Sequence, residues 1–273
     1  MTSNSRTVAI GSLGTIGLAV ARVVAAGELP GLTLGAVAAR DHAKAAANLA
    51  AIGAPEVPVV ALDALADHGD IVVEAAPAAV FREIAVNAVA AGRLFLPISV
   101  GALLSHMDLI DRARQTGAQI IVPTGALLGL DAVRAAAEGT IDSVTLTTRK
   151  PPGGLAGAPY LVENDISVEG LSEAKLVFSG SAREGAKGFP ANVNVAAALS
   201  LAGVGPDRTR LEIWADPAMT RNQHTIVVEA DSARLTLKIE NVPTVENPKT
   251  GKITALSVIT TLRRQTAALV AGS

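Results

Sequence analysis

The sequence predicts two domains, an α/β domain with a doubly wound parallel sheet followed by an α+β domain. Three observations lead to this prediction. The 273 residues suffice for two domains that each bury a core. Short, almost wholly apolar runs alternate with alanine-rich helical patterns as far as Pro123, as expected for parallel strands covered on both faces. Beyond Pro123, several strand-like runs alternate apolar and polar residues, which is typical of a sheet with one solvated face.

The elements of the first domain, residues 1–123, follow in chain order. Strands are predicted at 7–10, 32–38, 57–60, 70–74, 94–99 and 118–122. Helices are predicted from the glycines after the first strand to about residue 26, at 41–51, at 77–91 and from 105. Ser105 is followed by Asp108 at the spacing of a capping box, so we expect the last of these helices to begin at Ser105.

The second domain, residues 124–253, is strand-rich. Its strands are predicted at 143–148, 175–178, 210–214, 225–229 and 233–239, with helices near 128–138 and 193–202. The last segment, 254–273, is helical in its pattern to about residue 268, and we expect it to pack back on the first domain.

Composition excludes several classes of protein. The 23 basic and 25 acidic side chains give a net charge of −2, which disfavours nucleic acid and anionic membranes as partners. There are no cysteines, so disulfides and thiolate metal sites are excluded, and no histidine–carboxylate spacing predicts a metal site. Glycines interrupt the uncharged stretch between Arg6 and Arg22, which argues against a signal peptide. Asparagines and prolines in the uncharged stretch 188–206 argue against a membrane span, and we expect a cytoplasmic protein.

A glycine-rich turn between the first strand and the first helix is the most informative local feature. Gly11, Gly14 and Gly17 have the spacing G-x-x-G-x-x-G, with Ser12 at the position where the strict G-x-G-x-x-G motif has its first glycine. Such a turn places backbone N–H groups where a pyrophosphate can approach. The predicted contacts with a dinucleotide are made by Gly11, Leu13, Gly14, Thr15 and Ile16. The alternative is an ordinary glycine-rich turn without a ligand.

Two further positions lie at the carboxyl ends of predicted strands, the edge where ligands bind in open α/β sheets. Arg40 stands where an NAD-binding fold often has an acidic residue, and its guanidinium suits the 2′-phosphate of NADP. The alternative makes Arg40 a solvated charge and Asp41 a helix cap. Ala76, in the segment after the strand at 70–74, is a further candidate for cofactor contact.

Of the four histidines, His224 is the candidate for acid–base chemistry. It lies just before a strand of the second domain, whereas His42, His68 and His106 lie in polar settings of the first domain. A single histidine without a visible partner favours a structural role when it is taken alone.

Several motifs in one order resemble the L-aspartate dehydrogenase family, and the resemblance covers nearly the whole chain. They are the segments 123–131, 148–152, 178–184, 189–196 and 216–224. The resemblance implies a Rossmann-like dinucleotide domain joined to an α+β domain for substrate binding and dimerisation. It also implies oxidation of aspartate to iminosuccinate with NAD or NADP, in a homodimer whose small-molecule substrates are aspartate or oxaloacetate and ammonia.

Carried over by residue, the resemblance implies that His224 is catalytic and that Ala126 contacts the cofactor. An asparagine of the Asn-Val-Asn motif is a second cofactor contact, for which Asn192 is favoured, while Asn194 is assigned to the substrate. The substrate's two carboxylates need donors, and the candidates at the motif positions are Arg149, Lys150, Ser181 and Arg183. The alternative makes these four residues surface charges and a turn serine.

Oxidation of an α-amino acid requires a neutral amine, and a base with a pKa near 6.5 suits the removal of the ammonium proton. We therefore expect His224 to be that base. Homoserine dehydrogenase and dihydrodipicolinate reductase share the two-domain plan. The first would need Lys150 or Lys187 as a catalytic lysine, and the second a paired His-His motif that the sequence lacks. A further alternative is an NAD(P)H-binding sensor without turnover.

Overall fold

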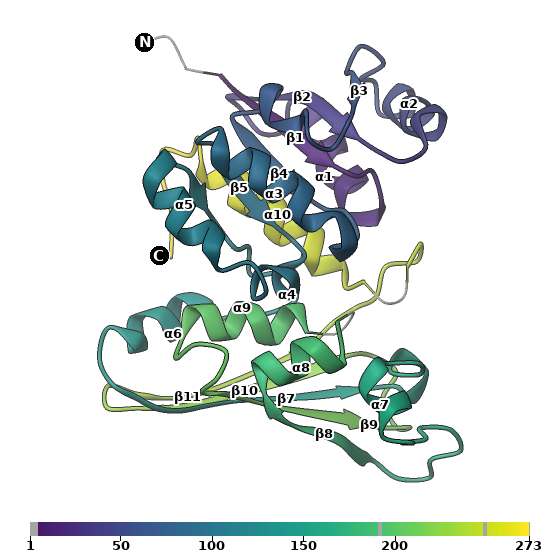
Figure 1. Ribbon diagram of the computed structural model, residues 1–273, viewed down its shortest axis with the longest axis vertical. Helices are drawn as coiled ribbons and strands as arrows, with labels where there is room; N and C mark the ends of the chain where they lie inside the picture. Colours follow the sequence, from purple (N-terminus) through teal and green to yellow (C-terminus); the bar gives the residue numbers. More distant parts are fainter. Residues whose placement is uncertain (1–4, 191–192, 248–249, 273) are drawn as a thin grey trace. The chain divides into compact units, whose positions relative to one another are not determined.

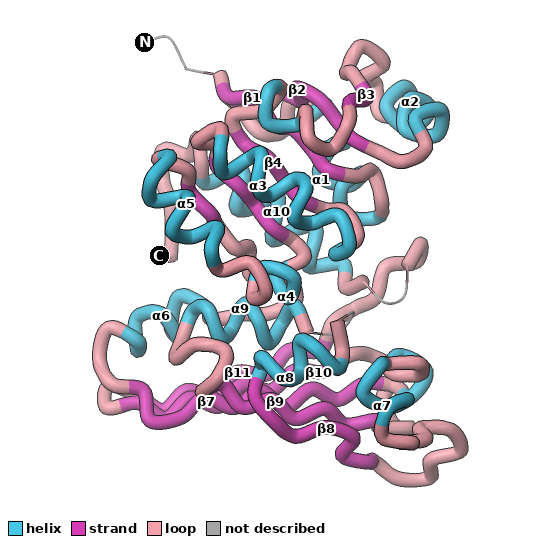
Figure 2. Tube along the Cα trace, viewed as in Figure 1, coloured by secondary structure: helices cyan, strands magenta, loops and turns pink. Residues whose placement is uncertain are grey.

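The computed structural model describes residues 5–190, 193–247 and 250–272, and the chain forms two compact units (Figure 1). Unit 1 comprises residues 1–123 and 254–271, and unit 2 comprises residues 124–253 with 272–273. Each unit contains one sheet, drawn in magenta in Figure 2, with helices packed on it. Within the described ranges, we find no helix with the length and apolar character needed to span a bilayer.

Unit 1 is built on a six-stranded sheet in which every pair of neighbouring strands is parallel. The spatial order is β3-β2-β1-β4-β5-β6. The strands are β1 (Arg6–Gly11), β2 (Leu32–Ala38), β3 (Val59–Val60), β4 (Ile71–Glu74), β5 (Leu94–Pro97) and β6 (Gln119–Ile120). The order reverses between β1 and β4, and doubly wound sheets bind ligands at such a switch point. The predicted doubly wound parallel sheet is confirmed.

Helices cover both faces of this sheet. They are α1 (Thr15–Ala25), α2 (His42–Ala51), α3 (Phe81–Ala90), α4 (Val100–Leu103), α5 (Asp108–Thr116) and α10 (Lys252–Arg264), with 3₁₀ turns η1 (Leu65–Asp67) and η2 (Ala78–Val80). Leu94 and Leu96 face the side of α1 and α10, whereas Phe95 faces α3, with its ring 5.9 Å from that of Phe81. Burial on both faces explains why the strands are almost wholly apolar.

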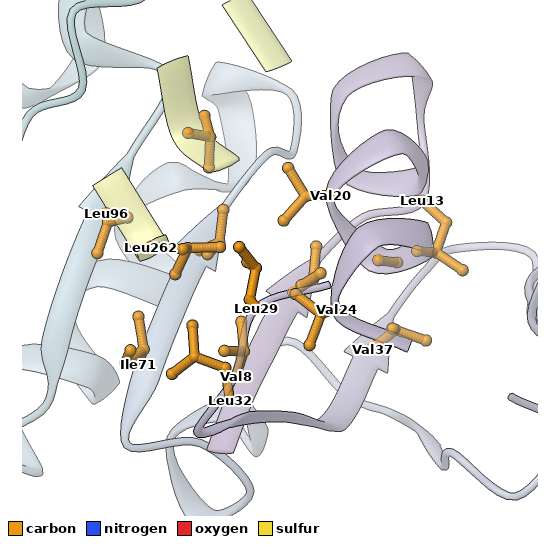
Figure 3. Packing of buried hydrophobic residues seen from close by; sticks show 14 of the residues in the cluster. Val8, Leu13, Val20, Val24, Leu29, Leu32, Val37, Ile71, Leu96 and Leu262 are labelled. Carbon is orange, nitrogen blue, oxygen red and sulfur yellow. The ribbon is translucent and has the colours of Figure 1, made fainter. Parts of the chain in front are cut away.

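The core on one face of the sheet joins segments that lie far apart in the sequence. Val20 and Val24 of α1 pack with Val8 of β1 and with Leu262 of α10 in one buried cluster (Figure 3). Burial of each such side chain contributes about 1.5–3 kcal/mol to the free energy of folding. Helix α10 is therefore an integral part of the core of unit 1.

The predicted start of the helix at Ser105 is wrong. Helix α5 begins at Asp108 after Met107, and Ser105 lies in a turn in which its N–H donates to the Ala102 carbonyl. The short helix α4, which was not predicted, ends just before this turn. Asp108 instead supplies a negative charge to the first turn of α5, where it interacts favourably with the helix dipole.

Unit 2 contains a five-stranded mixed sheet in the order β11-β10-β7-β9-β8. Its strands are β7 (Ile141–Lys150), β8 (Lys175–Ser181), β9 (Thr209–Ala215), β10 (Gln223–Ala230) and β11 (Arg234–Glu240). The pair β7–β9 is parallel, and the other pairs are antiparallel. This mixed sheet with helices confirms the predicted α+β domain.

The helices of unit 2 are α6 (Leu130–Ala137), α7 (Pro159–Glu163), α8 (Ala182–Gly188) and α9 (Asn194–Ala202), with a 3₁₀ turn η3 (Pro152–Gly154). Figure 1 shows α6, α8 and α9 on one face of the sheet. Along β7, alternate residues from Val144 to Lys150 are buried, and those between them are half-buried or exposed. The helices α7 and α8 were not predicted, because they are short and α8 contains two glycines.

Candidate functional site

The glycine turn lies at the switch point of the sheet of unit 1. Strand β1 ends at Gly11, and α1 begins at Thr15 with Gly14 as its N-cap. An added Cβ on Gly17 would lie 1.9 Å from the Ser12 carbonyl oxygen, so only glycine permits this close packing of helix against turn. A Cβ on Gly14 would meet nothing closer than Ser12 Oγ at 3.7 Å, so the turn is open at that point.

These residues fit a dinucleotide phosphate. Helix α1 has no side-chain cap on its first N–H groups among the described residues, and uncapped N–H groups at a helix start attract anions. Thr15 and Gly14 stand at this start, while Leu13 and Ile16 pack against the hydrophobic cluster. A dinucleotide would therefore meet Leu13 and Ile16 through their backbone.

Ser12 adopts a backbone conformation that favours glycine, with φ at +92°. The Gly14 N–H donates to its Oγ at 3.3 Å, a weak and exposed bond. Replacement Ser12→Gly removes the strain of a left-handed residue and is expected to raise the free energy of unfolding by up to about 1 kcal/mol, measured by urea unfolding. Ser167→Gly is the matched control. Ser167 Oγ accepts a similar bond from the Glu169 N–H without a positive φ, so this change should lower stability.

The carboxyl end of β2 carries the residues expected to distinguish NAD from NADP. Arg40 is exposed two residues after the end of the strand. Asp41 is the N-cap of α2, with its Oδ1 accepting a bond of 2.9 Å from the Lys44 N–H. The interpretation of Asp41 as a helix cap is confirmed, and Arg40 is placed on the surface.

A buried carboxylate holds together the ends of β4 and β5. Glu74 is fully buried and accepts bonds from the N–H groups of Ala76, Ile98 and Ser99 and from Ser99 Oγ. Burial raises the pKa of Glu74 to about 7, although these four donors act in the opposite direction. The candidate Ala76 is thus held beside the switch point by two hydrogen bonds. Its N–H donates to Glu74, and its carbonyl accepts from Ser99 Oγ.

In unit 2, His224 lies on the helix-covered face of the sheet. It is opposite Thr148 on the neighbouring strand, and its Nδ1 lies 3.0 Å from Thr148 Oγ1. Lys150 lies two residues further along β7 on the same face. All three side chains are at least nine-tenths buried.

The pKa of His224 on this face is lower than the value near 6.5 that was expected for the base. Burial, with the positive charge of Lys150 as a smaller cause, lowers the pKa of His224 to about 3. Burial also lowers the pKa of Lys150 to about 8. His224 is therefore neutral at pH 7, while Lys150 is close to its titration point.

A cavity of about 600 Å³ lies beside this face, within unit 2. Its apolar wall comes from the loop that follows β7 and from Phe189 and Pro190. Its polar lining consists of Lys150, Thr220, Arg221, Asn222 and Asn241. The cavity thus combines two cations with several neutral polar groups.

Arg149 does not join Lys150 in this cavity. Consecutive residues of a strand face opposite sides of the sheet, so the two cations are separated by the sheet itself. Arg149 pairs with Asp216 at 3.0 Å, and its guanidinium lies 4.9 Å from the ring centroid of Trp214.

The other predicted substrate contacts have local roles. Ser181 caps α8 in a capping box with Glu184, where its Oγ donates to Glu184 Oε2 and accepts from the Glu184 N–H. Arg183 makes a two-pronged ion pair with Asp207, at 2.6 and 2.8 Å. Asn194 is the first residue of α9 and is exposed.

Of the predicted cofactor contacts in unit 2, Asn192 lies outside the described residues. Ala126 is half-buried, and its carbonyl accepts a bond of 3.1 Å from Asn241 Nδ2. Sequence reasoning overlooked Asn241 and Arg221. A signal existed for Arg221, which lies three residues before His224 in one of the quoted motifs, but Asn241 follows an edge strand without any motif.

Two family models match the chain. The model described as "Aspartate dehydrogenase, C-terminal" matches residues 131–265, and the model described as "Homoserine dehydrogenase, NAD binding domain" matches residues 13–123. The chain is 56% identical to the L-aspartate dehydrogenase of Bradyrhizobium diazoefficiens, covering 99% of this chain and 95% of that relative. It is 53% identical to L-aspartate dehydrogenase 3 of Bordetella bronchiseptica, with 97% of each chain covered.

Solved structures agree with these relatives. The aspartate dehydrogenase from Thermotoga maritima has a TM-score of 0.74 at 25% identity, covering 98% of this chain and 99% of that one. A homoserine dehydrogenase from Thiobacillus denitrificans has a TM-score of 0.61 at 15% identity, covering 95% and 73%, which is a likeness of fold alone. The similarity extends over both units, from the glycine turn to the final helix.

Proposed function

The chain belongs to the L-aspartate dehydrogenase family of NAD(P)-dependent enzymes, and we propose that it oxidises L-aspartate at Cα with His224 as the acid–base residue. The observation that carries the proposal is the 56% identity to an L-aspartate dehydrogenase over 99% of the chain. The products are iminosuccinate, which water converts to oxaloacetate and ammonia, and the reduced dinucleotide. The reverse reaction is reductive amination of oxaloacetate.

The cavity of unit 2 supplies the donors that a dicarboxylate needs. Lys150 is buried in its wall, and Arg221 contributes a guanidinium that can bind a carboxylate through two N–H groups. We assign one substrate carboxylate to each cation. Arg149, Ser181 and Arg183 are engaged elsewhere by the contacts described above, so Lys150 is the predicted donor that this assignment retains.

His224 exchanges the proton of the substrate amine. When its Nδ1–H donates to Thr148 Oγ1, Nε2 carries the lone pair that accepts a proton, and the contact with Thr148 orients the ring. A substrate carboxylate beside Lys150 would offset the charge of that ammonium and raise the pKa of His224 from its low value. The base thus gains proton affinity when the substrate binds.

The glycine turn of unit 1 holds the dinucleotide, and Ala76 and Arg40 lie at neighbouring strand ends of the same sheet. The nicotinamide ring accepts the hydride from Cα when the cofactor is bound. Arg40 is exposed and able to bind the 2′-phosphate of NADP, so either dinucleotide suits the site.

The test is the oxidation of NADH and, separately, of NADPH on addition of oxaloacetate with ammonium, followed at 340 nm. We expect oxidation that requires both oxaloacetate and ammonium, and the faster of the two dinucleotides identifies the preferred cofactor. Oxidation that proceeds equally without ammonium would contradict amino-acid chemistry. Binding of NADH without any oxidation would favour the sensor alternative.

Lys150 predicts a pH dependence of dicarboxylate binding. Its pKa is about 8, so the ammonium is charged below pH 8 and neutral above it. The inhibition constant of succinate, a dicarboxylate without an amine, should rise by up to about tenfold per pH unit above pH 8. In Lys150→Arg the constant should stay flat to pH 9.5, because a guanidinium remains charged.

The control for this measurement is Lys175→Arg, which makes the same exchange at an exposed lysine of β8 and should follow the wild-type profile. A wild-type inhibition constant that does not change between pH 7 and 9.5 would show that the charge of Lys150 does not hold the carboxylate.

We also propose that the protein is a homodimer formed through unit 2, as the family resemblance implies. Figure 1 draws the described helices α6, α8 and α9 on one face of the sheet, and residues such as Thr147 and Arg149 lie on the other. Light scattering coupled to size exclusion measures the mass directly. The cytoplasmic location remains a prediction.

A further inference from the structure

One polar atom in the cavity of unit 2 has no assigned role. Asn241 is only 5% exposed, and its Oδ1 is buried without a hydrogen-bond partner among the described residues. A buried acceptor without a donor costs about 1–3 kcal/mol, so such atoms call for an explanation. Asn241 lines the same cavity as Lys150.

The orientation of the Asn241 amide is fixed by its neighbour. Its Nδ2 donates to the Ala126 carbonyl at 3.1 Å, and only the NH₂ end of an amide can donate to a carbonyl. The backbone is held as well, because the Asn241 N–H donates to the Asn222 carbonyl at 2.9 Å. The oxygen is therefore held in place as an acceptor.

A glycine lies beside this oxygen. Gly251 also lines the cavity, and an added Cβ there would lie 3.4 Å from Asn241 Oδ1. A hydrogen-bond donor approaches to about 2.9 Å, so a methyl group at this position would obstruct it. Glycine therefore places no side chain against this oxygen.

We propose that Asn241 Oδ1 accepts a hydrogen bond from the amino group of the substrate. The proposal rests on the proposed function, in which Lys150 and Arg221 bind the carboxylates of aspartate. Cations bind those carboxylates but cannot bind an ammonium group, which needs an acceptor. Asn241 thereby distinguishes an amino dicarboxylate from a dicarboxylate that lacks the amine.

The experiment compares the binding of aspartate and of succinate to enzyme saturated with NADH, by isothermal titration. Reduced cofactor prevents oxidation of aspartate, so binding is measured without turnover. We expect Asn241→Leu and Gly251→Ala to weaken aspartate binding at least about tenfold and succinate binding less than about threefold. Each variant should therefore lose the preference for aspartate over succinate.

The two variants test the NH₂ end and the oxygen of the Asn241 amide separately. Asn241→Leu also removes the bond to Ala126, whereas Gly251→Ala keeps the amide and its donor end and adds a methyl group beside the oxygen. Gly251→Ala also keeps the proposal testable if the leucine variant does not fold. Asn164→Leu is the matched control, since it removes an exposed amide that donates to the Tyr160 carbonyl, and both affinities should stay unchanged.

Equal losses for aspartate and succinate would overturn the proposal, as would unchanged aspartate binding in both variants. Weaker NADH binding with an unchanged preference for aspartate would assign the oxygen to the carboxamide of the cofactor and would also overturn it. Failure of the proposed function is recognised separately, because wild-type enzyme would then show no ammonium-dependent oxidation of NADH.

Discussion

His224→Ala is expected to lose most of the turnover while retaining dinucleotide binding. A positioned acid–base group contributes about 10²–10⁴ to the rate, and His224 is the residue to which the family resemblance assigns this role. Because the dinucleotide turn belongs to unit 1 and His224 to unit 2, NADH binding should persist. The measurements are kcat with saturating aspartate and the NADH dissociation constant by fluorescence.

The alanine variant also removes the partner of a buried hydroxyl, Thr148 Oγ1, and leaves space in a packed interior. His224→Asn is therefore the second variant, because an amide can still bond Thr148 and cannot act as a base at neutral pH. His42→Asn makes the same exchange at an exposed histidine and should have wild-type activity. Near-normal turnover in a folded His224→Asn enzyme would exclude His224 as the acid–base residue.

Gly17→Ala is expected to destabilise unit 1 and to abolish dinucleotide binding. The new methyl carbon would lie 1.9 Å from the Ser12 carbonyl oxygen, and neither partner is a flexible side chain that can move aside. The helix must shift from the turn, at a cost of about 3 kcal/mol or more. Thermal unfolding followed by circular dichroism and titration with NADH measure the two effects.

Gly14→Ala is the matched variant in the same turn. Its φ is −71°, and its added carbon would meet only Ser12 Oγ at 3.7 Å, so only the small loss of stability of a poorer N-cap is expected. The same methyl group would stand at the start of α1, where the phosphate approaches, and should weaken NADH binding. If Gly17→Ala melts at the wild-type temperature, the close contact of helix and turn is not required.

The sheet of unit 1 could be predicted from the sequence because each strand is buried on both faces. An almost continuous apolar run such as that of β2 is then visible without knowledge of its neighbours, and the predicted range for β2 matches the observed strand. In unit 2 the strands show alternation instead, and their centres were predicted although their ends differ by one or more residues.

Caps were less predictable than strands. The S-x-x-[DE] spacing occurs at Ser105 with Asp108 and at Ser181 with Glu184, and the structure forms a capping box only at the second. The pattern cannot distinguish them, because it does not show that Ser105 lies in a turn after the short helix α4. Ser181 was predicted as a substrate ligand from its place in a motif, and the structure engages its hydroxyl in the cap.

Cavity residues were the hardest to find. Arg149 and Lys150 were predicted together because both are cations at the positions of one motif, but consecutive residues of a strand lie on opposite faces of the sheet. Asn241 became visible only through its tertiary neighbours Ala126 and Gly251, which no local pattern links to it. Motifs thus included several residues that line the cavity, while the rest of its lining depends on tertiary contacts.

Helix α10 has a consequence for biosynthesis. Val258 and Leu262 are fully buried in the core of unit 1, yet the ribosome makes them only after residues 124–253 of unit 2. The apolar surface of unit 1 that packs against α10 therefore stays exposed while unit 2 is synthesised. Such exposure favours aggregation or chaperone binding. A chain released before residue 252 would keep this surface exposed, so synthesis of α10 is a condition for complete burial of the core of unit 1.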